Sequence, residues 1–585
     1  MVFQEWAWKT GTSRAVSRQA VACHLHSLTF TCIQPLKTPA AILSGVATSV
    51  VVAISLAWIN AGLHGAVPWC AFLAGILVAT IVFRGVPSSS GSCVSFWDWV
   101  MIAVFSCASA RAFFWLIYAD GDSWKVLSPN NLGDLSLHLA FIHHLAETTR
   151  WWPQSPILAG DHLRYPLGAD LFNALLERVG MHPEIGLLWC GILGAMLTGY
   201  ALWRWGGAMA LAALLFNGGV AGVVLLRGTD PDTASEWKNL FLTLFVTQRG
   251  FLFALPAGLL LLAAWREESF GKSRNIILPL PVQALLLGAI PLFSIHAGLF
   301  LGIAMTGLAL LAPISRERMV RLALLAWPVM AFFGWLITSG AGGPSAVHSL
   351  GWAPGWMEDG TVGFWFWNFG ITLPLCVFLS FMLMRRGGNK EARAFVWPAA
   401  FVFMLCMIIR FAPWPWDNMK LMLWSWLVII PYLWSAFLCS SPLWLRLSVL
   451  VLLFGSGAAT LLAGLDGRHG YELIKRSSLD QSAWILRKID PDAVIAVAPE
   501  YNHPVLMLGH PVVCGYEGHL WSHGLDYKSR LIILNSIMMG EPGWSEKARS
   551  LGVSYLYWSD LEAKRWPDSK LPWARETTPS LHPVE

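Results

Sequence analysis

The chain contains few charged residues. Only 13% of its 585 residues are Asp, Glu, Lys or Arg, whereas soluble globular domains carry about a quarter. Hydrophobic residues make up 56% of the sequence. The formal net charge of +5 is small for this length, which excludes a disordered chain and a nucleic-acid-binding protein. This composition predicts an integral membrane protein.

Paired cysteines and a signal peptide are also missing. The ten cysteines lie mostly inside apolar runs without the spacing of a zinc site, so we expect neither a disulfide framework nor a zinc centre. Residues 1–39 are of mixed polarity and include Lys9, Arg14, Arg18 and Lys37, which is not the pattern of a cleavable signal. Membrane insertion is therefore expected to depend on the first apolar span.

Apolar runs of about twenty residues, long enough to cross a bilayer as a helix, recur along the chain. The sequence predicts roughly thirteen of them, with Pro291 breaking the seventh and eighth apart. The predicted spans are 40–62, 66–84, 96–118, 185–203, 207–226, 240–264, 277–293, 295–312, 320–338, 363–384, 395–412, 419–440 and 445–465.

The distribution of Lys and Arg between loops predicts the orientation. Cytoplasmic loops retain positive charge, and here Lys and Arg fall in alternate loops, whereas the loop 339–362 has none. We therefore expect a cytoplasmic segment 1–39, a membrane domain 40–465 and an extracytoplasmic domain 466–585, in a bacterial inner (plasma) membrane. The positive loops contain Arg204, then Arg266, Lys272 and Arg274, then Arg316, Arg318 and Arg321, then Arg385, Arg386, Lys390 and Arg393.

The terminal domain has an α/β pattern. The expected strand Ala493–Ala498 is followed by an expected helix Tyr527–Met539 and by a strand Val553–Trp558. The fold class predicted is thus a polytopic α-helical membrane protein, resembling the GT-C arrangement described below, with a C-terminal extracytoplasmic α/β domain.

The long outer loop 119–184 holds the first candidate site. Leu135, Leu139, Ile142 and Leu145 have helical spacing, which predicts a helix over 134–149 lying along the membrane surface. Asp134 and His138 are four residues apart and share one face of this helix. A carboxylate there is suited to act as the general base on an acceptor hydroxyl. The alternative is that Asp134 only caps the helix.

Further polar residues follow in the same loop, namely Asp161, His162 and Tyr165. A turn here leads into a helix that returns to the membrane, so these residues are placed to close a site from above. A solvated loop is the alternative for Asp161 and His162.

Ionisable residues inside apolar spans are a stronger signal, because an unpaired charge in hydrocarbon costs several kcal/mol. Arg249 falls in the outer half of its predicted span, His296 starts a span at the outer side and Arg410 ends one there. A tight turn after Arg410 holds Asp417 and Lys420. Arginine and lysine are suited to bind a lipid phosphate. A simple Asp417–Lys420 ion pair and a buried, hydrogen-bonded His296 are the alternatives.

Two other groups are possible ligands of sugars or metals. Asp230 and Asp232 lie in an acidic outer loop that offers oxygen ligands to a divalent cation, although solvated acids have the same pattern. No other cofactor is expected. Polar and aromatic residues after strands of the terminal domain are candidates for sugar binding or for an interdomain contact: His503, His519, Trp521 and His523.

Short motifs follow one another in the outer loop. They are Gly133-Asp134, His138, Trp152-Pro153, Gly160 and Tyr165-Pro166-Leu167. Their order resembles the first external loop of GT-C glycosyltransferases, membrane enzymes that use polyprenyl-phosphate-linked sugars. In that class an early acidic residue is the catalytic base, which implies this role for Asp134. The many spans and external C-terminal domain are also similar to oligosaccharyltransferase catalytic subunits and aminoarabinose transferases.

The chain also departs from that class. Residues 40–84 are expected to be an added hairpin of two spans before the one span that usually precedes this loop in the class, and Leu135 follows Asp134 where many relatives have Glu. A Trp-Trp-Asp-Tyr-Gly signature is missing, which argues against protein N-glycosylation. The expected partners are a polyprenyl-phosphate sugar and membrane lipid. Two other functions remain open, a lipid or glycan transporter and a non-catalytic envelope assembly protein.

Overall fold

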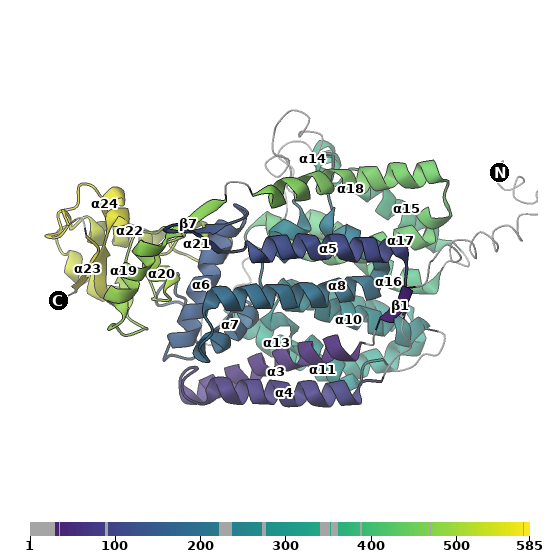
Figure 1. Ribbon diagram of the computed structural model, residues 1–585, viewed down its shortest axis with the longest axis horizontal. Coiled ribbons are helices and arrows are strands. Elements are labelled where there is room, and N and C mark those ends of the chain that lie inside the picture. The colour runs from purple at the N-terminus through teal and green to yellow at the C-terminus, as the bar shows by residue number, and fades with distance from the viewer. Residues whose placement is uncertain are drawn as a thin grey trace, which may run out of the picture.

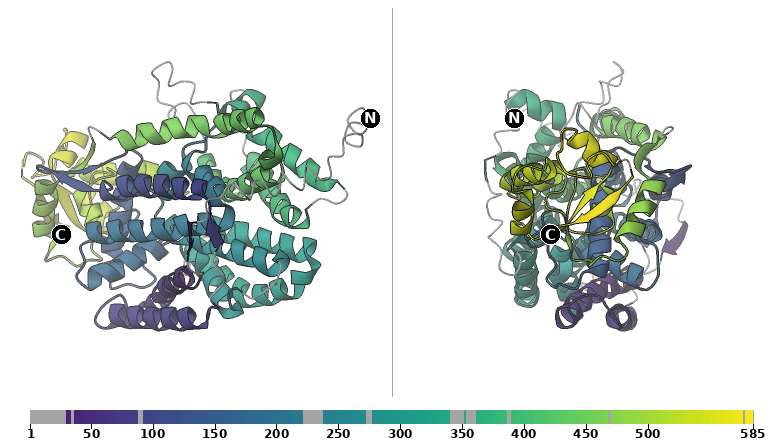
Figure 2. Two further views of the ribbon diagram at one scale, coloured as in Figure 1. Left: turned by 45° about the vertical axis from the view of Figure 1, so that its right-hand side comes forward. Right: turned by 90° about the vertical axis from the view of Figure 1, so that its left-hand side faces the viewer.

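Long helices run side by side in a bundle, and the C-terminal elements cover one end of it (Figures 1 and 2). This is a computed structural model, and it describes residues 30–33, 36–87, 92–220, 237–271, 277–339, 351–352, 361–385, 389–467, 470–576 and 578–584. Within these ranges seven helices are long and apolar enough to cross a membrane, or eight if the bent pair Gly363–Phe369 and Thr372–Met384 is one span. The chain is a helical integral membrane protein.

Most predicted apolar runs coincide with helices of the bundle. The predicted break near Pro291 is confirmed, since a short 3-10 turn at Ile290–Leu292 separates α11 from α12. The bundle helices are α3 (Lys37–Asn60), α4 (Val67–Gly85), α5 (Phe96–Phe114), α8 (Pro183–Leu215), α10 (Phe251–Phe270), α11 (Leu280–Ala289), α12 (Ile295–Leu311), α13 (Arg316–Ser339), α14 (Thr361–Phe369), α15 (Thr372–Met384), α16 (Lys390–Ile408), α17 (Met419–Ala436) and α18 (Leu443–Asp466).

The region between residues 183 and 250 differs from the prediction. The runs 185–203 and 207–226 join into α8, which is broken at Gly206 and Gly207 and ends at Leu215. Asn, Gly and Gly follow at 217–219, and these residues disfavour a helix. The expected span 240–264 is also interrupted, because a π-helix, η2 (Phe241–Phe245), precedes a turn before α10. Arg249 therefore lies in a turn at the start of α10.

Two helices of the outer loop close one end of the bundle. They are α6 (Asn131–Glu147) and α7 (Gly168–Arg178), which pack on each other. α6 also contacts α20 (Pro504–Met507) and β7 (Tyr471–Lys475), and most of its residues are buried. The helix predicted over 134–149 is thus present as α6, which begins three residues earlier and runs across the direction of the bundle helices (Figure 1), and the C-terminal elements pack on it.

The C-terminal region, residues 470–584, contributes to two sheets. β7 extends an antiparallel hairpin formed by β3 (Tyr118–Asp120) and β4 (Ser123–Val126) of the outer loop. The second sheet has the order β10-β9-β8, with the central strand β9 (Val553–Trp558) at the predicted position. Its partners are β8 (Val494–Ala496), parallel to β9, and β10 (Ser580–Pro583), antiparallel to it; the helices of the region are α19 (Arg476–Leu486), α20, α21 (Glu517–Ser522), α22 (Lys528–Met538), α23 (Trp544–Ser550) and α24 (Asp560–Arg565).

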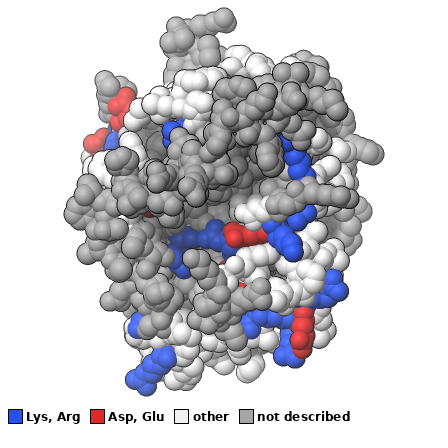
Figure 3. Space-filling model, turned by 90° about the vertical axis from the view of Figure 1, so that its right-hand side faces the viewer, with Lys and Arg blue, Asp and Glu red and all other residues white. Residues whose placement is uncertain are grey.

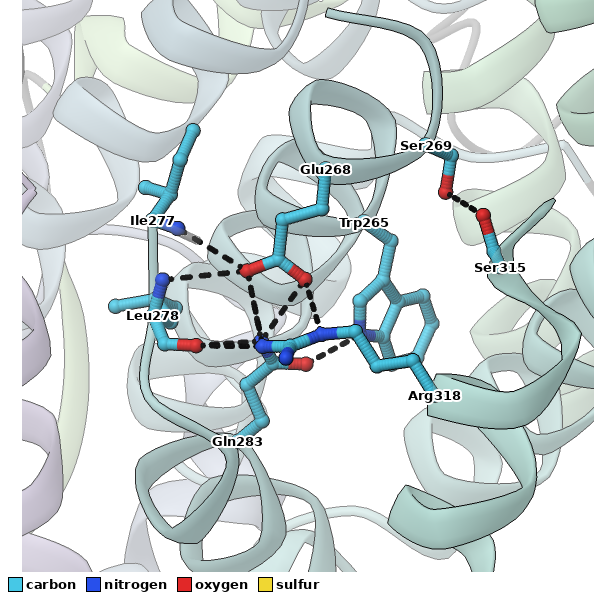
Figure 4. Close-up of polar contacts among 8 residues, drawn as sticks. All are labelled: Trp265, Glu268, Ser269, Ile277, Leu278, Gln283, Ser315 and Arg318. Carbon is cyan, nitrogen blue, oxygen red and sulfur yellow. Dashed lines mark hydrogen bonds and ion pairs between the residues drawn. The ribbon is translucent and has the colours of Figure 1, made fainter. Parts of the chain in front are cut away.

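Lys and Arg side chains are spread over the opposite end of the bundle (Figure 3). The side chain of Arg266 there donates to the backbone oxygens of Arg204 and Trp205, which joins α10 to the end of the first half of α8. The Glu268 side chain, 5% exposed, accepts hydrogen bonds from Arg318 Nε at 2.8 Å and from Gln283 Nε2 at 3.0 Å (Figure 4). This network joins α10, α11 and α13.

Replacing Glu268 by alanine is expected to destabilise the bundle, because it leaves Arg318 and Gln283 without their carboxylate. Removing one partner of a buried pair typically costs about 3–5 kcal/mol. Thermal unfolding in detergent should show a clearly lower midpoint. The matched control is Glu317→Ala, which removes an exposed ion pair with Arg321 and is expected to change the midpoint little. Equal midpoints for the two variants would contradict a structural role of the network.

Candidate functional site

Asp134 lies at the start of α6, at the end of the bundle that the C-terminal region covers. Its Oδ2 accepts a hydrogen bond from Gln248 Nε2 at 3.1 Å. The helix begins at Asn131, with Asn130 in the cap position, so the alternative interpretation of Asp134 as the helix cap is wrong. The carboxylate is instead held toward the turn that precedes α10.

His138 lies one turn further along α6 and is fully buried. Its Nδ1 is 2.9 and 3.0 Å from the two carboxylate oxygens of Asp170, in the first turn of α7. The side chains of His138 and Asp170 are 2% and 1% exposed. This bidentate contact fixes the imidazole ring and joins α6 to α7.

Arg249 supplies a buried cation to the same place. The residue is 1% exposed, and within the described ranges none of its three guanidinium nitrogens has a hydrogen-bond partner. The charges of Asp170 and Asp134 both act on it. Gly250 permits this arrangement, because a Cβ there would lie 1.9 Å from the backbone oxygen of Phe293. The turn holding Arg249 therefore packs directly against the start of α12.

A second charged pair lies at the start of α17. Lys420 Nζ is 3.0 Å from Asp417 Oδ1, so the ion pair given above as the alternative interpretation forms. Both charges act on His296 in the first turn of α12 and on His523 of the C-terminal region. Asp417 also acts on Tyr165. The pair thus belongs to one cluster with the candidate residues of the outer loop.

Tyr165 connects the outer loop to the C-terminal region. Its ring centroid is 5.4 Å from that of His523 and 6.0 Å from that of His138. Burial raises the pKa of the Tyr165 phenol well above its usual value, and the carboxylates of Asp170, Asp134 and Asp417 act in the same direction. The phenol therefore stays protonated at neutral pH and is available as a hydrogen-bond donor.

Two histidines of the C-terminal region cover the cluster. His519 lies against the backbone of Gly133, since a Cβ there would be 3.3 Å from its Nε2. Burial, and then the neighbouring His138, lower the pKa of His519 from 6.5 to about 4. Burial, and then His519 and Lys420, lower the pKa of His523 to about 4, against the opposing effect of Asp417 and Asp134. Both imidazoles are neutral at neutral pH.

These two histidines predict acid sensitivity of the covering region. The unfolded chain takes up a proton near pH 6.5, whereas the folded protein does so only near pH 4, so stability falls as the pH is lowered through this window. The midpoint of thermal unfolding is expected to fall between pH 7 and pH 4.5. The double variant with His519→Gln and His523→Gln should show a smaller fall, while His182→Gln, an exposed histidine, should retain the slope of the native protein.

Other sequence candidates lie elsewhere. Arg410 pairs through its backbone with Gly351, and no described contact joins its side chain to the cluster. Asp161 forms an ion pair with Arg164 at 2.7 Å, and His162 pairs through its backbone with Gln154. These two residues are held within the outer loop itself.

The remaining sugar-binding and metal candidates also differ in position. His503 is buried inside the C-terminal region, with Nε2 2.9 Å from Glu562 Oε1. Trp521 is 50% exposed, and its ring centroid lies 6.1 Å from that of Trp414 in the turn after α16. Asp230 and Asp232 lie outside the described residues. Among the residues that are described, no three His, Cys, Asp or Glu side chains are grouped to hold a metal ion.

Asp170 is the main residue that the sequence analysis did not single out. It lies five residues after Tyr165, in the helix predicted to return to the membrane. The sequence signal for Asp170 is an acidic residue followed directly by the apolar residues Leu171 and Phe172 in a helix expected to approach the membrane. Its partner His138 is 32 positions away, and no periodicity in the sequence relates the two.

The sequence matches no protein-family model and no curated protein. Several solved structures match part of this chain, among them the following three. An Archaeoglobus fulgidus oligosaccharyltransferase tethered to an acceptor peptide matches with a TM-score of 0.47 and 11% identity over 84% of this chain and 74% of its own. The mycobacterial arabinofuranosyltransferase AftD matches with 0.44 and 16% over 79% of this chain and 36% of its own.

The third structure is the A. fulgidus oligosaccharyltransferase AglB, in complex with an inhibitory peptide and a dolichol-phosphate. It matches with a TM-score of 0.36 and 10% identity over 84% of this chain and 74% of its own. AglB and AftD are both GT-C membrane glycosyltransferases, the superfamily that the outer-loop motifs resemble. All three TM-scores are below 0.5.

Proposed function

We propose that this protein is a membrane glycosyltransferase that moves a sugar from a polyprenyl-phosphate donor to a lipid, glycan or protein acceptor. The observation that carries the proposal is the buried Arg249 guanidinium, which has no hydrogen-bond partner in the described structure and lies within the electrostatic reach of Asp134. A buried cation without a bonded partner is costly, and an incoming phosphate satisfies it with charge-assisted hydrogen bonds.

The N-terminal ends of three helices favour the binding of an anion in this cluster. Arg249 precedes α10, His296 lies in the first turn of α12, and Lys420 lies in the first turn of α17. Helix N-termini carry partial positive charge, so all three helices favour a negative group between them. A phosphate held there adds the negative charge that Arg249 and Lys420 favour.

An apolar groove beside the cluster supports a lipid-linked donor. It has a volume of about 810 Å³ and follows α12 for most of its length, between α13 and α16. Its lining includes Pro291 and Ile295, which is next to His296 in the sequence, and a Cβ at Gly302 would meet no atom within 4 Å. A long hydrocarbon chain fits a groove of this shape, with its phosphate at the end where the charged residues lie.

The proposed chemistry is a displacement at the anomeric carbon of the donor. The acceptor hydroxyl oxygen forms the new bond to this carbon while Asp134 takes the hydroxyl proton. The bond from the carbon to the phosphate oxygen breaks, and its electron pair leaves with the polyprenyl phosphate. Arg249 and Lys420 stabilise the charge that develops on this oxygen. Tyr165 and His523 line the sugar side of the site, which we place on the extracytoplasmic face, with the N-terminus in the cytoplasm.

A transporter is the main alternative, because transporters often place broken helices at their substrate sites. The break in α8 has another explanation in this structure. Asp98, which forms a capping box with Ser95 at the start of α5, also accepts a hydrogen bond from Ala208 N at 2.7 Å. The break at Gly206 and Gly207 is thus a capped turn, held by the N-terminus of a neighbouring helix.

The test uses purified protein in lipid nanodiscs with radiolabelled polyprenyl-phosphate sugars and extracted cell-envelope glycolipids as acceptors. The proposal predicts release of polyprenyl phosphate together with a labelled acceptor. If proteoliposomes move the labelled donor across the bilayer and its sugar–phosphate bond stays intact with every donor and acceptor, the protein is a transporter and the proposal fails.

A further inference from the structure

Asp170 contacts the imidazole of His138, and its charge acts on the guanidinium of Arg249. Both of its carboxylate oxygens are within 3.0 Å of His138 Nδ1. Among the neighbouring charged groups, Asp170 acts on Arg249 more strongly than Asp134 does. The proposed chemistry above assigns no role to this buried carboxylate.

The contact with His138 decides which ring nitrogen carries the proton. A carboxylate only accepts hydrogen bonds, so Nδ1 must be the donor. In the neutral ring this leaves Nε2 as a hydrogen-bond acceptor on the opposite side of the imidazole. His138 is one helical turn from Asp134 on the same face of α6, so an acceptor or sugar hydroxyl bound beside Asp134 lies close to this ring.

The proximity to Arg249 has a different consequence. In a site of low dielectric, a guanidinium with no negative charge nearby attracts a phosphate strongly. The same attraction slows the release of that phosphate. A carboxylate nearby offsets part of this attraction. The lipid phosphate left after transfer is the group whose release depends on this balance.

We propose that Asp170 is a positioning residue with two roles. It holds His138 so that Nε2 faces the bound hydroxyl, and it weakens the binding of the polyprenyl-phosphate product to Arg249. This inference rests on the proposed transferase function. It makes an unusual prediction, because removing the negative charge tightens product binding and slows the reaction.

The test is the variant Asp170→Asn, which keeps the size of the side chain and removes its charge. We expect its Kd for a short-chain polyprenyl monophosphate to fall about tenfold, which corresponds to about 1.4 kcal/mol. We also expect kcat to fall by about 10²-fold or more, because His138 is no longer held in one tautomer. A purely structural role predicts weaker binding together with lower activity.

Two further variants separate charge from geometry. Asp170→Glu keeps the charge but displaces the carboxylate, so it should retain the Kd of the native protein and lose kcat. Glu562→Gln disrupts a different buried acid–histidine pair, with His503, in the C-terminal region. It should lower the thermal midpoint without tightening phosphate binding.

The outcomes distinguish the two proposals. If the native protein binds the phosphate and transfers sugar, but Asp170→Asn binds it no more tightly, the inference about Asp170 fails and the proposed function stands. If the native protein neither binds the phosphate nor transfers sugar, the proposed function fails and this inference fails with it.

Discussion

Replacing Asp134 by asparagine is expected to reduce the rate of sugar transfer by roughly 10²–10⁴-fold, the usual contribution of a general base. The amide keeps the size of the side chain and its contact with Gln248, but it cannot take the acceptor proton. Binding of a polyprenyl monophosphate should change little, because the phosphate is held by Arg249 and Lys420. The rate is measured as labelled acceptor formed per minute by purified protein in nanodiscs.

The control for this variant is Asp120→Asn. Asp120 lies in strand β3 near the same end of the molecule, with its side chain 60% exposed and paired with Lys125. Its amide variant is expected to keep the native rate. An Asp134→Asn protein that is folded, inserted and as active as the native protein would refute the role of Asp134 as the base.

Replacing Arg249 by methionine is expected to weaken binding of the polyprenyl phosphate by about 10²-fold, because charge-assisted hydrogen bonds contribute about 1.5–3 kcal/mol. The same variant should be at least as stable as the native protein without ligand, since a buried guanidinium with no partner costs free energy of folding. Ligand titration and thermal unfolding measure the two effects on one sample.

The variant Arg249→Lys provides the matched comparison. Lysine keeps the charge but offers no planar fork, so affinity should fall between those of the native and methionine proteins. If methionine lowered the thermal midpoint and left affinity unchanged, Arg249 would be a structural residue, and the phosphate site would have to lie elsewhere.

The membrane fold follows from local patterns in the sequence. The thickness of the bilayer sets the length of a spanning helix at about twenty residues. The observed bounds of α3, α4 and α18 are therefore close to those predicted from their apolar runs. Both boundaries of the strand Val553–Trp558 were predicted correctly, because its β-branched and aromatic residues are bounded by a glycine and a serine. Such features depend on near neighbours in the chain.

Features that depend on distant segments were not predicted. The helix α6 was predicted from its spacing, but the sequence does not reveal that α20 and β7 pack on it. The pairing of Asp170 with His138 has the same cause. Arg410 was expected beside Asp134 and Arg249 from its depth in the membrane, but it lies after the end of α16 in a short strand that pairs with Gly351, a segment distant in the sequence.

Candidate residues from separate helices and turns lie together at the end of the bundle that the C-terminal region covers. Asp134, Arg249 and Lys420 were each singled out as an ionisable group at the predicted outer face, and they belong to one cluster in the structure. Membrane depth was sufficient here, because a buried charge in an apolar surrounding must find partners at the same level.

The most direct measurement is a cryo-EM structure of the protein with a polyprenyl monophosphate bound. The account predicts phosphate oxygens within about 2.7–2.9 Å of the Arg249 guanidinium nitrogens, the range for charge-assisted hydrogen bonds, with the lipid chain in the groove along α12. Density for the phosphate at the opposite, arginine-rich end of the bundle, with Asp134 facing bulk water, would contradict it.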